Sequence, residues 1–273
     1  MAREFRFGIG LRSIGSAQRL RDRVRQFADL GYDVVHFPDH LGAPAPLPAM
    51  VAAAAASPGI RVGTYVLNAA FYRPALLARD IGDVNLLCED RLEAGLGTGY
   101  VREEFEAAGI PCPSAGERVE HLSRTVEHLR RAAPDVPLLI AGNGDRVLTL
   151  AAQQADIIGF SAGPAGSHAA DPLAERIALV RKAAGARFND LELNLAITAV
   201  PTDPSGVPDL TLTRAYAPGH SDKELMAMPS VLSGSPRRIA DTLIAQRDTY
   251  GMTYFTVQDY HGKYFAQVIN ALR

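Results

Sequence analysis

Residues 5–38 read FRFGIGLRSIGSAQRLRDRVRQFADLGYDVVHFP and contain one complete strand–helix–strand pattern. The runs Phe5–Leu11 and Val34–Pro38 are mostly apolar rather than alternating, which is typical of parallel strands covered on both faces. Between the runs, Ser16 is a good helix N-cap, and Gly31 supplies the left-handed conformation that ends a helix. The stretch therefore predicts two parallel strands joined by a helix.

The same rhythm continues along the rest of the chain. Further β-like runs are expected at Arg61–Leu67, Arg91–Leu96, Pro137–Ala141, Asp156–Ser161, Glu192–Val200 and Tyr254–Gln258. Helical stretches are expected near Pro48–Ala56, Pro74–Leu87, Glu117–Ala133, Arg146–Gln154, Pro172–Ala184, Ser235–Gly251 and Gly262–Leu272.

The number of these units decides between two α/β architectures. About eight strand–helix units in 273 residues is the size and rhythm of a closed barrel. The sequence therefore predicts an α/β fold, a single-domain (β/α)8 TIM barrel over residues 1–273. A doubly wound open sheet is the structural alternative, but it rarely needs so many units in one domain.

Composition excludes several classes of protein. The chain is 47% apolar with a net charge of −2 from 28 Lys+Arg and 30 Asp+Glu, which excludes a disordered chain. No concentrated basic excess points to nucleic acid. The longest apolar stretch, near Pro48–Ala56, is too short to cross a bilayer, and the N-terminus lacks the regions of a signal peptide. With only Cys88 and Cys112 no disulfide framework is expected, so we expect a cytoplasmic protein without membrane contact.

Residues 201–235 form the least regular stretch of the chain. They are rich in Pro, Gly, Ser and Asp, with a short helix expected around Asp222–Met228. In a barrel this insertion follows the seventh strand, on the face where ligands bind. It is either a lid over the site or a mobile surface insertion, and both interpretations stay open.

A turn after the fifth predicted strand has the chemistry of an anion site. Gly142 and Gly144 straddle Asn143, which lets the backbone turn tightly into the helix expected near Arg146–Gln154. The free N–H groups and the dipole of such a helix attract an anion, usually a phosphate, and Arg146 could add a charge-assisted contact. Strand–helix turns often need glycine for conformational reasons alone, so this motif by itself is a weak signal.

Two further strand ends carry candidate groups. Asp39 and His40 form the only acid–histidine pair at a predicted strand end, and histidine can donate or accept a proton near neutral pH. A structural histidine at the barrel mouth is the alternative. A metal site that adds His36 is not expected, because residues 36 and 40 lie too far apart on one strand to chelate easily. The turn Gly97-Thr98-Gly99 would let a planar ligand approach the backbone.

Taken together in order, these segments resemble a known family over nearly the whole chain: the bacterial luciferase-like flavin and deazaflavin oxidoreductases, particularly the branch that uses coenzyme F420. The segments that carry the resemblance are Phe37-Pro38-Asp39-His40, Arg61–Val66, Arg73-Pro74-Ala75, Arg91–Gly99, Glu104, Gly109-Ile110 and Ala141–Gly144. The resemblance implies hydride transfer between F420 and a small organic substrate, in a homodimer.

The resemblance also implies roles for individual residues. Tyr65–Val66 would form a non-proline cis peptide behind the tricyclic ring, and Asn68 would face the pyrimidine edge of that ring. His40 would lie near the reactive centre, where it exchanges a proton and is oriented by Asp39. The other cofactor-binding residues would be Gly97, Thr98 and Gly99 beside the ring, and Gly142, Asn143, Gly144, Asp145 and Arg146 at the phosphate.

Two features depart from the family pattern and leave other functions open. The long insertion that many relatives carry before the fifth strand is missing, because residues 130–136 pass almost directly into it. Tyr65 is also bulkier than the residue that deazaflavin relatives often have. An FMN-dependent luciferase-like monooxygenase supplied by a partner reductase, and a non-catalytic flavin-binding relative, are therefore the alternatives.

Overall fold

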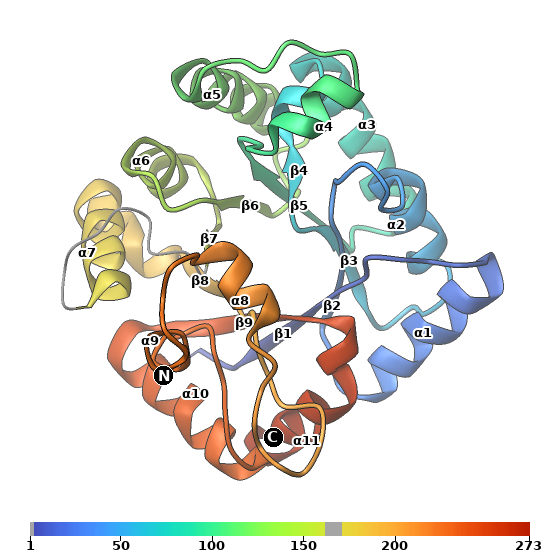
Figure 1. Cartoon of the computed structure of the whole chain (residues 1–273). Helices are drawn as coiled ribbons and strands as arrows, with labels where there is room; N and C mark the ends of the chain where they lie inside the picture. The colour runs from blue at the N-terminus through green and yellow to red at the C-terminus, as the bar shows by residue number, and fades with distance from the viewer. Residues whose placement is uncertain (1–2, 162–170) are drawn as a thin grey trace.

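The structure is a computed structural model that describes residues 3–161 and 171–273 (Figure 1). All strand pairings within these residues are parallel. The strands are β1 (Arg6–Gly10), β2 (Val34–Phe37), β3 (Arg61–Thr64), β4 (Leu67–Asn68), β5 (Leu92–Gly97), β6 (Leu138–Ala141), β7 (Ile157–Phe160), β8 (Glu192–Ala196) and β9 (Met252–Gln258).

The strands close into a barrel. Their order is β3-β2-β1-β9-β8-β7-β6-β5-β4, and β3 also pairs with β5, which joins the two ends. Strands β3 and β4 are the two halves of the single strand predicted at 61–67, and the cis peptide bond between Tyr65 and Val66 lies between them. The ring is thus an eight-strand barrel, and the predicted fold is confirmed.

Helices surround the barrel, as Figure 1 shows in a view with the strands at the centre. Their bounds are α1 (Ala17–Asp29), α2 (Pro46–Ala54), α3 (Pro74–Leu87), α4 (Arg102–Ala107), α5 (Ala115–Ala132), α6 (Asp145–Gln154), α7 (Pro172–Ala184), α8 (Thr211–Tyr216), α9 (Asp222–Met226), α10 (Pro236–Tyr250) and α11 (Gly262–Leu272). Short 3₁₀ turns cover Ala69–Phe71, Gly185–Asp190 and Asp259–His261. No helix of the described residues is both long enough and apolar enough to span a membrane.

The first unit shows why the sequence folds in this way. The Ser16 hydroxyl accepts a hydrogen bond from the Arg19 N–H and caps α1, and Gly31 has a φ of 87° just beyond its end. Phe7 and Ile9 of β1 are fully buried against the helix layer. Gly8, which alternates with them, leaves room inside the barrel for the ring of His36: a Cβ at Gly8 would lie 2.7 Å from its Cε1 atom.

Strand β8 ends earlier than predicted. The sequence predicts a strand to Val200, but the regular ladder stops at Ala196. Beyond it, the Thr198 N–H donates to the carbonyl of Ser230, so this segment pairs with the insertion instead of with the barrel. The insertion at 201–235 contains α8 and α9, and α9 agrees with the short helix expected there. Its role as a lid stays a prediction.

Candidate active site

A cavity of about 380 Å³ opens at the carboxyl ends of the strands. Most of the predicted site residues line it: Asp39, His40, Tyr65, Val66, Asn68, Gly97, Thr98, Gly99, Gly142 and Asn143. Gly144, Asp145 and Arg146 do not belong to its lining. The strand ends therefore meet around one cavity, as catalytic groups of parallel barrels do.

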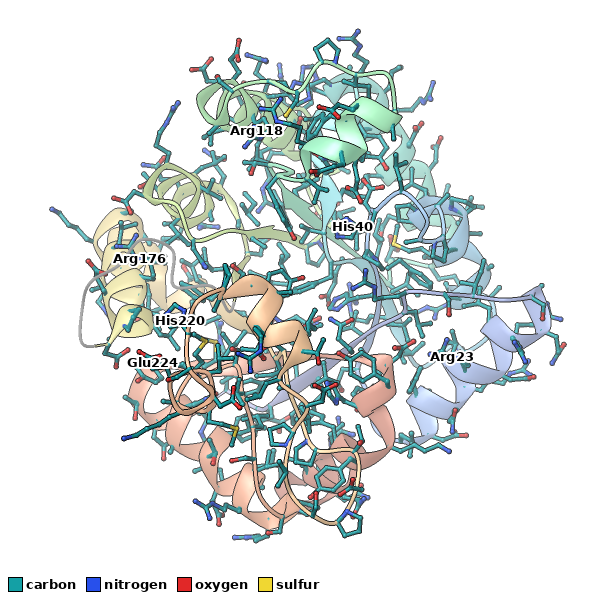
Figure 2. The ribbon with its side chains drawn as sticks, in the orientation of Figure 1. Arg23, His40, Arg118, Arg176, His220 and Glu224 are labelled. Carbon is teal, nitrogen blue, oxygen red and sulfur yellow. The ribbon has the colours of Figure 1, made fainter. Side chains whose placement is uncertain are left out.

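His40 is held by a carboxylate. Its Nδ1 atom lies 2.9 Å from Oε1 of Glu104, which belongs to α4. Both side chains are partly buried, with exposed fractions of 34% for His40 and 16% for Glu104. A tautomer that donates from Nδ1 to Glu104 leaves the Nε2 lone pair of His40 as a proton acceptor, and the carboxylate stabilises the imidazolium that results. Figure 2 shows His40 towards the centre of the ring of helices.

The hydrogen bonds of Asp39 go to groups other than His40, and the predicted role of Asp39 in orienting His40 stays a prediction. Its carboxylate accepts a hydrogen bond of 3.0 Å from the Asn68 N–H and another from the Tyr72 hydroxyl. Burial raises the pKa of Asp39, and these two hydrogen bonds oppose the rise. Asp39 thus ties the end of β2 to β4, and Glu104 is the group that fixes the imidazole. Sequence reasoning gave Glu104 no role, because its contact with His40 exists only in the folded chain.

Tyr65 occupies the floor of the cavity. The peptide bond that joins it to Val66 is cis, as predicted. Its ring stacks on His36 with 5.1 Å between ring centroids, and its hydroxyl donates to Oδ1 of Asn194 at 2.6 Å. Burial raises the pKa of Tyr65, so the phenol stays neutral. The bulk of this side chain lies inside the barrel.

His36 and His40 lie in different surroundings. His36 is buried in the barrel, 3.0 Å from the Tyr254 hydroxyl through Nε2, and burial followed by the charge of Arg6 lowers its pKa to about 3. His40 faces Glu104 at the cavity. Within residues 3–161 and 171–273, no three His, Cys, Asp or Glu side chains gather as a metal site would require.

The turn after β5 packs tightly on Asn68. Gly99 has a φ of 68°, and a Cβ there would lie 2.1 Å from Oδ1 of Asn68. That oxygen accepts a hydrogen bond of 3.1 Å from the Ala70 N–H, which holds the amide in place. The turn and Asn68 therefore form one rigid wall of the cavity.

The predicted phosphate loop follows β6. Asn143 donates through Nδ2 to the Ser161 carbonyl at 3.1 Å and accepts through Oδ1 from the Ser161 N–H at 3.2 Å. Gly144 is the N-cap of α6 and offers no capping side chain, so the first N–H groups of α6 are suited to an anion.

A second arginine, besides the predicted Arg146, contacts this loop. Arg146 is 61% exposed and points to Glu120, 3.6 Å away on α5. Arg176 of α7 instead donates to the Asn143 carbonyl at 3.4 Å, forms an ion pair with Asp145, and is 13% exposed. Figure 2 shows Arg176 on α7. Sequence reasoning missed Arg176, because no local motif marks an arginine that reaches back from the next helix.

The insertion at 201–235 contributes side chains to the wall of the cavity. Leu212 and Tyr216 of α8 line it, together with Tyr100 from the turn after β5. The Thr198 and Thr213 hydroxyls, 2.8 Å apart and buried, fasten α8 to the segment after β8. In Figure 1, α8 lies closer to the centre of the barrel than α10 does.

The sequence matches the family model described as luciferase-like monooxygenase over residues 4–207. The chain belongs to the luciferase-like monooxygenase family. This luciferase-like protein is also similar to two curated F420-dependent glucose-6-phosphate dehydrogenases. It is 31% identical to that of Intrasporangium calvum over 125 residues, and 32% identical to that of Kribbella flavida over 111 residues.

Those alignments cover only part of each protein. They include 42% and 37% of this chain, and 37% and 33% of the two relatives. The luciferase-like chain thus spans well under two thirds of the length of these curated relatives.

Solved structures share the fold over the whole chain. The F420-dependent tetrahydromethanopterin reductase of Methanopyrus kandleri superposes with a TM-score of 0.79 at 15% identity, covering 99% of this chain and 100% of the other. An F420-dependent secondary alcohol dehydrogenase, solved with an F420-acetone adduct, gives a TM-score of 0.79 at 17% identity with the same coverage. A monooxygenase from Streptomyces bottropensis gives 0.74 at 18% identity, covering 97% of each chain. These similarities support the fold of the luciferase-like protein.

Proposed function

We propose that this luciferase-like protein is an F420-dependent oxidoreductase that transfers a hydride between the deazaflavin and a small organic substrate. The observation that carries the proposal is the His40–Glu104 pair on the cavity whose other walls are the glycine turns after β5 and β6. Its curated relatives named as F420-dependent enzymes support the choice of cofactor.

The residues present fit such a cofactor. The cavity volume of about 380 Å³ lies in the range of small-molecule sites. The turn at Gly97–Gly99 and the side chain of Asn68 would border the ring, and Gly142 with Asn143 would lie at its phosphate. When bound, the deazaflavin would supply two-electron hydride transfer, and the protein would supply orientation and electrostatics.

The proton that accompanies the hydride is the task we assign to His40. In the direction of substrate oxidation, its Nε2 atom accepts the proton from a substrate hydroxyl. Glu104 keeps the imidazole oriented and balances the positive charge that forms. Asp39 acts at a distance, because it fixes the backbone between β2 and β4.

FMN is the competing cofactor. The argument for FMN from the bulk of Tyr65 is weakened, because that side chain lies on the floor of the cavity against His36 and Asn194. The glycine turns and the phosphate loop suit either tricyclic ring, so binding must discriminate between them.

The deciding experiment is a titration of the purified apoprotein with F420 and, separately, with FMN, followed by the fluorescence of each cofactor. We expect F420 to bind and FMN to bind at least tenfold more weakly.

A turnover assay follows the titration. The F420 complex is mixed with glucose 6-phosphate and with propan-2-ol, and loss of the oxidised deazaflavin absorbance reports hydride transfer. Tight binding of FMN without affinity for F420 would reject the proposal. Tight cofactor binding without turnover of any substrate tested would favour the non-catalytic alternative. The homodimer stays a prediction.

A further inference from the structure

Arg12 stands on the side of the cavity opposite the phosphate loop. It follows β1. When β3 and β4 are counted as one strand, the ring has eight strands, and β6 is the fourth strand from β1 in either direction. The loop with Gly142 and Asn143 follows β6. Arg12 and Asn143 both line the cavity, so they face it from opposite sides of the barrel mouth.

The charge of Arg12 is not balanced by a neighbouring carboxylate. Arg12 is the only lysine or arginine among the described residues that line the cavity. Asp39 and Glu104, which also line it, are hydrogen-bonded to Asn68 and His40. In the part of the chain that the structure describes, Arg12 forms no hydrogen bond or ion pair with any acid.

The acid that directly follows the adjoining strand β9 is already engaged. Asp259 forms an ion pair with Arg23 of α1. Arg12 is an exposed residue that also lines the cavity, so its charge is accessible to a ligand. An arginine in this state matches a planar anion with two hydrogen bonds.

Phenol and apolar groups line the same cavity as Arg12, whose charge acts on the Tyr100 phenol. Tyr100 and Tyr216 share a hydrogen bond across the cavity, between the turn after β5 and α8. Partial burial and then Tyr216 raise the pKa of Tyr100 to about 12, while Arg12 lowers it, so the phenol remains a neutral donor. Leu212 and Ile197 add apolar surface to the cavity.

We propose that this half of the cavity binds a substrate with one carboxylate, with the anion on Arg12 and the apolar body beneath α8 against Leu212 and Tyr216. The proposal rests on the proposed function, because it assigns the substrate side of that site. A single cation matches a single negative charge. A phosphate dianion would leave one charge unpaired near the carboxylates of Asp39 and Glu104.

The test compares isosteric probes that differ in charge. Benzoate and benzamide are titrated into the wild-type chain and into Arg12→Gln, in the apoprotein and in the complex with whichever cofactor binds, with ligand-observed NMR as the readout. We expect benzoate to bind about tenfold tighter than benzamide to the wild-type chain, and that ratio to fall to about one in Arg12→Gln. Arg12→Lys keeps the charge without the planar fork and should retain part of the preference.

A matched control variant tests whether the preference comes from Arg12 itself. Arg237→Gln removes the same charge from an exposed position on α10, paired only with Asp241 among the described residues, and should leave the benzoate preference unchanged. A wild-type preference below about threefold, or one that survives in Arg12→Gln, overturns the proposal. Tighter binding of phenyl phosphate than of benzoate overturns the choice of a carboxylate.

The cofactor offers a second source of negative charge. If Arg12→Gln weakens F420 binding and leaves the benzoate ratio intact, Arg12 contacts the cofactor and the substrate assignment fails. Binding of FMN in place of F420 rejects the proposed cofactor but leaves the charge preference of the probes measurable. The two proposals therefore fail in different measurements.

Discussion

The imidazole of His40 has one hydrogen-bond partner in the described structure, and that partner decides what the imidazole can do. With Nδ1 engaged by Glu104, only Nε2 is available to a substrate proton. We predict that His40→Asn lowers the turnover rate by about 10²–10⁴-fold and changes cofactor affinity by less than about threefold. The measurement is the single-turnover rate of F420 reduction, with a substrate that the wild-type chain oxidises, beside a fluorescence titration of the cofactor.

A control and a graded variant sharpen this prediction. Glu104→Gln keeps the hydrogen bond but removes the charge, and its rate should fall between those of wild type and His40→Asn. His128→Asn, on the outer helix α5, should change neither rate nor affinity. An unchanged rate in His40→Asn would remove His40 from proton transfer.

His36 makes stability depend on pH. Its pKa is about 3 in the folded chain and near its ordinary value of 6.5 in the unfolded chain. Between these pH values only the unfolded chain binds the proton, so lowering the pH favours unfolding, and above 6.5 the effect is absent. The expected slope from this group is about 1.4 kcal/mol per pH unit at its steepest. Urea denaturation between pH 4 and 7 should show a shallower slope for His36→Gln than for wild type, and equal slopes would contradict the assignment.

Individual site residues could be predicted only where they directly follow a predicted strand. Asp39 and His40 follow a predicted strand directly, and both line the cavity. Glu104, Arg176 and Tyr216 reach the site from helices, and no local pattern distinguishes them from solvated residues. Arg146 has the favourable local position and nevertheless faces Glu120, because the neighbouring helix offers it a carboxylate.

At the scale of elements, Gly99 in the turn after β5 and Gly109 beyond the end of α4 form a matched pair of glycines. Gly99 and Gly109 have the same φ of 68°, but only Gly99 faces Asn68, since a Cβ at Gly109 meets nothing within 4 Å. We predict that Gly99→Ala and Gly109→Ala each lower the free energy of unfolding by about 1–2 kcal/mol, because alanine is strained in the left-handed backbone conformation of both positions. Gly99→Ala should lose more because of its clash, and should also weaken cofactor binding about tenfold.

Urea denaturation and cofactor titration of the two variants check this pair. Equal cofactor affinity in Gly99→Ala and wild type would contradict the role of Asn68 in the cavity wall. A loss of affinity in Gly109→Ala would show that backbone strain alone is responsible.

The sequence predicted the long elements well and the short ones poorly. Strands and helices with a clear apolar period, such as α1 and α3, lie where they were expected. The helices α4 and α8 were missed because each has only six residues and no side chain that caps its start. Both matter to the site, because α4 carries Glu104 and α8 carries Tyr216.

At the scale of the whole molecule, closure of the barrel could be predicted from the count of strand–helix units. The side chains that fill its axis could not be predicted in this way. Five strands contribute polar side chains to one partly buried cluster at the end of the barrel opposite the cavity. The cluster consists of Arg6, Arg61, Glu93, Glu192 and Tyr254. Each residue looks ordinary in its own strand, so only the closed ring shows that they meet.

Glu93 is the centre of this cluster and the best test of closure. Its side chain is 3% exposed, contacts Arg6, accepts from Nε of Arg61 at 2.9 Å, and accepts from the Tyr254 hydroxyl at 3.2 Å. Glu93→Gln removes the buried anion that Arg6 and Arg61 share, although Arg6 keeps its ion pair with Glu192. We predict a loss of about 3–5 kcal/mol in unfolding free energy, measured by urea denaturation. Asp241→Asn breaks the exposed pair with Arg237 on α10 and should cost less than about 1 kcal/mol. If Glu93→Gln is as mild as Asp241→Asn, the barrel is held by its apolar layers, and the buried charges merely occupy its axis.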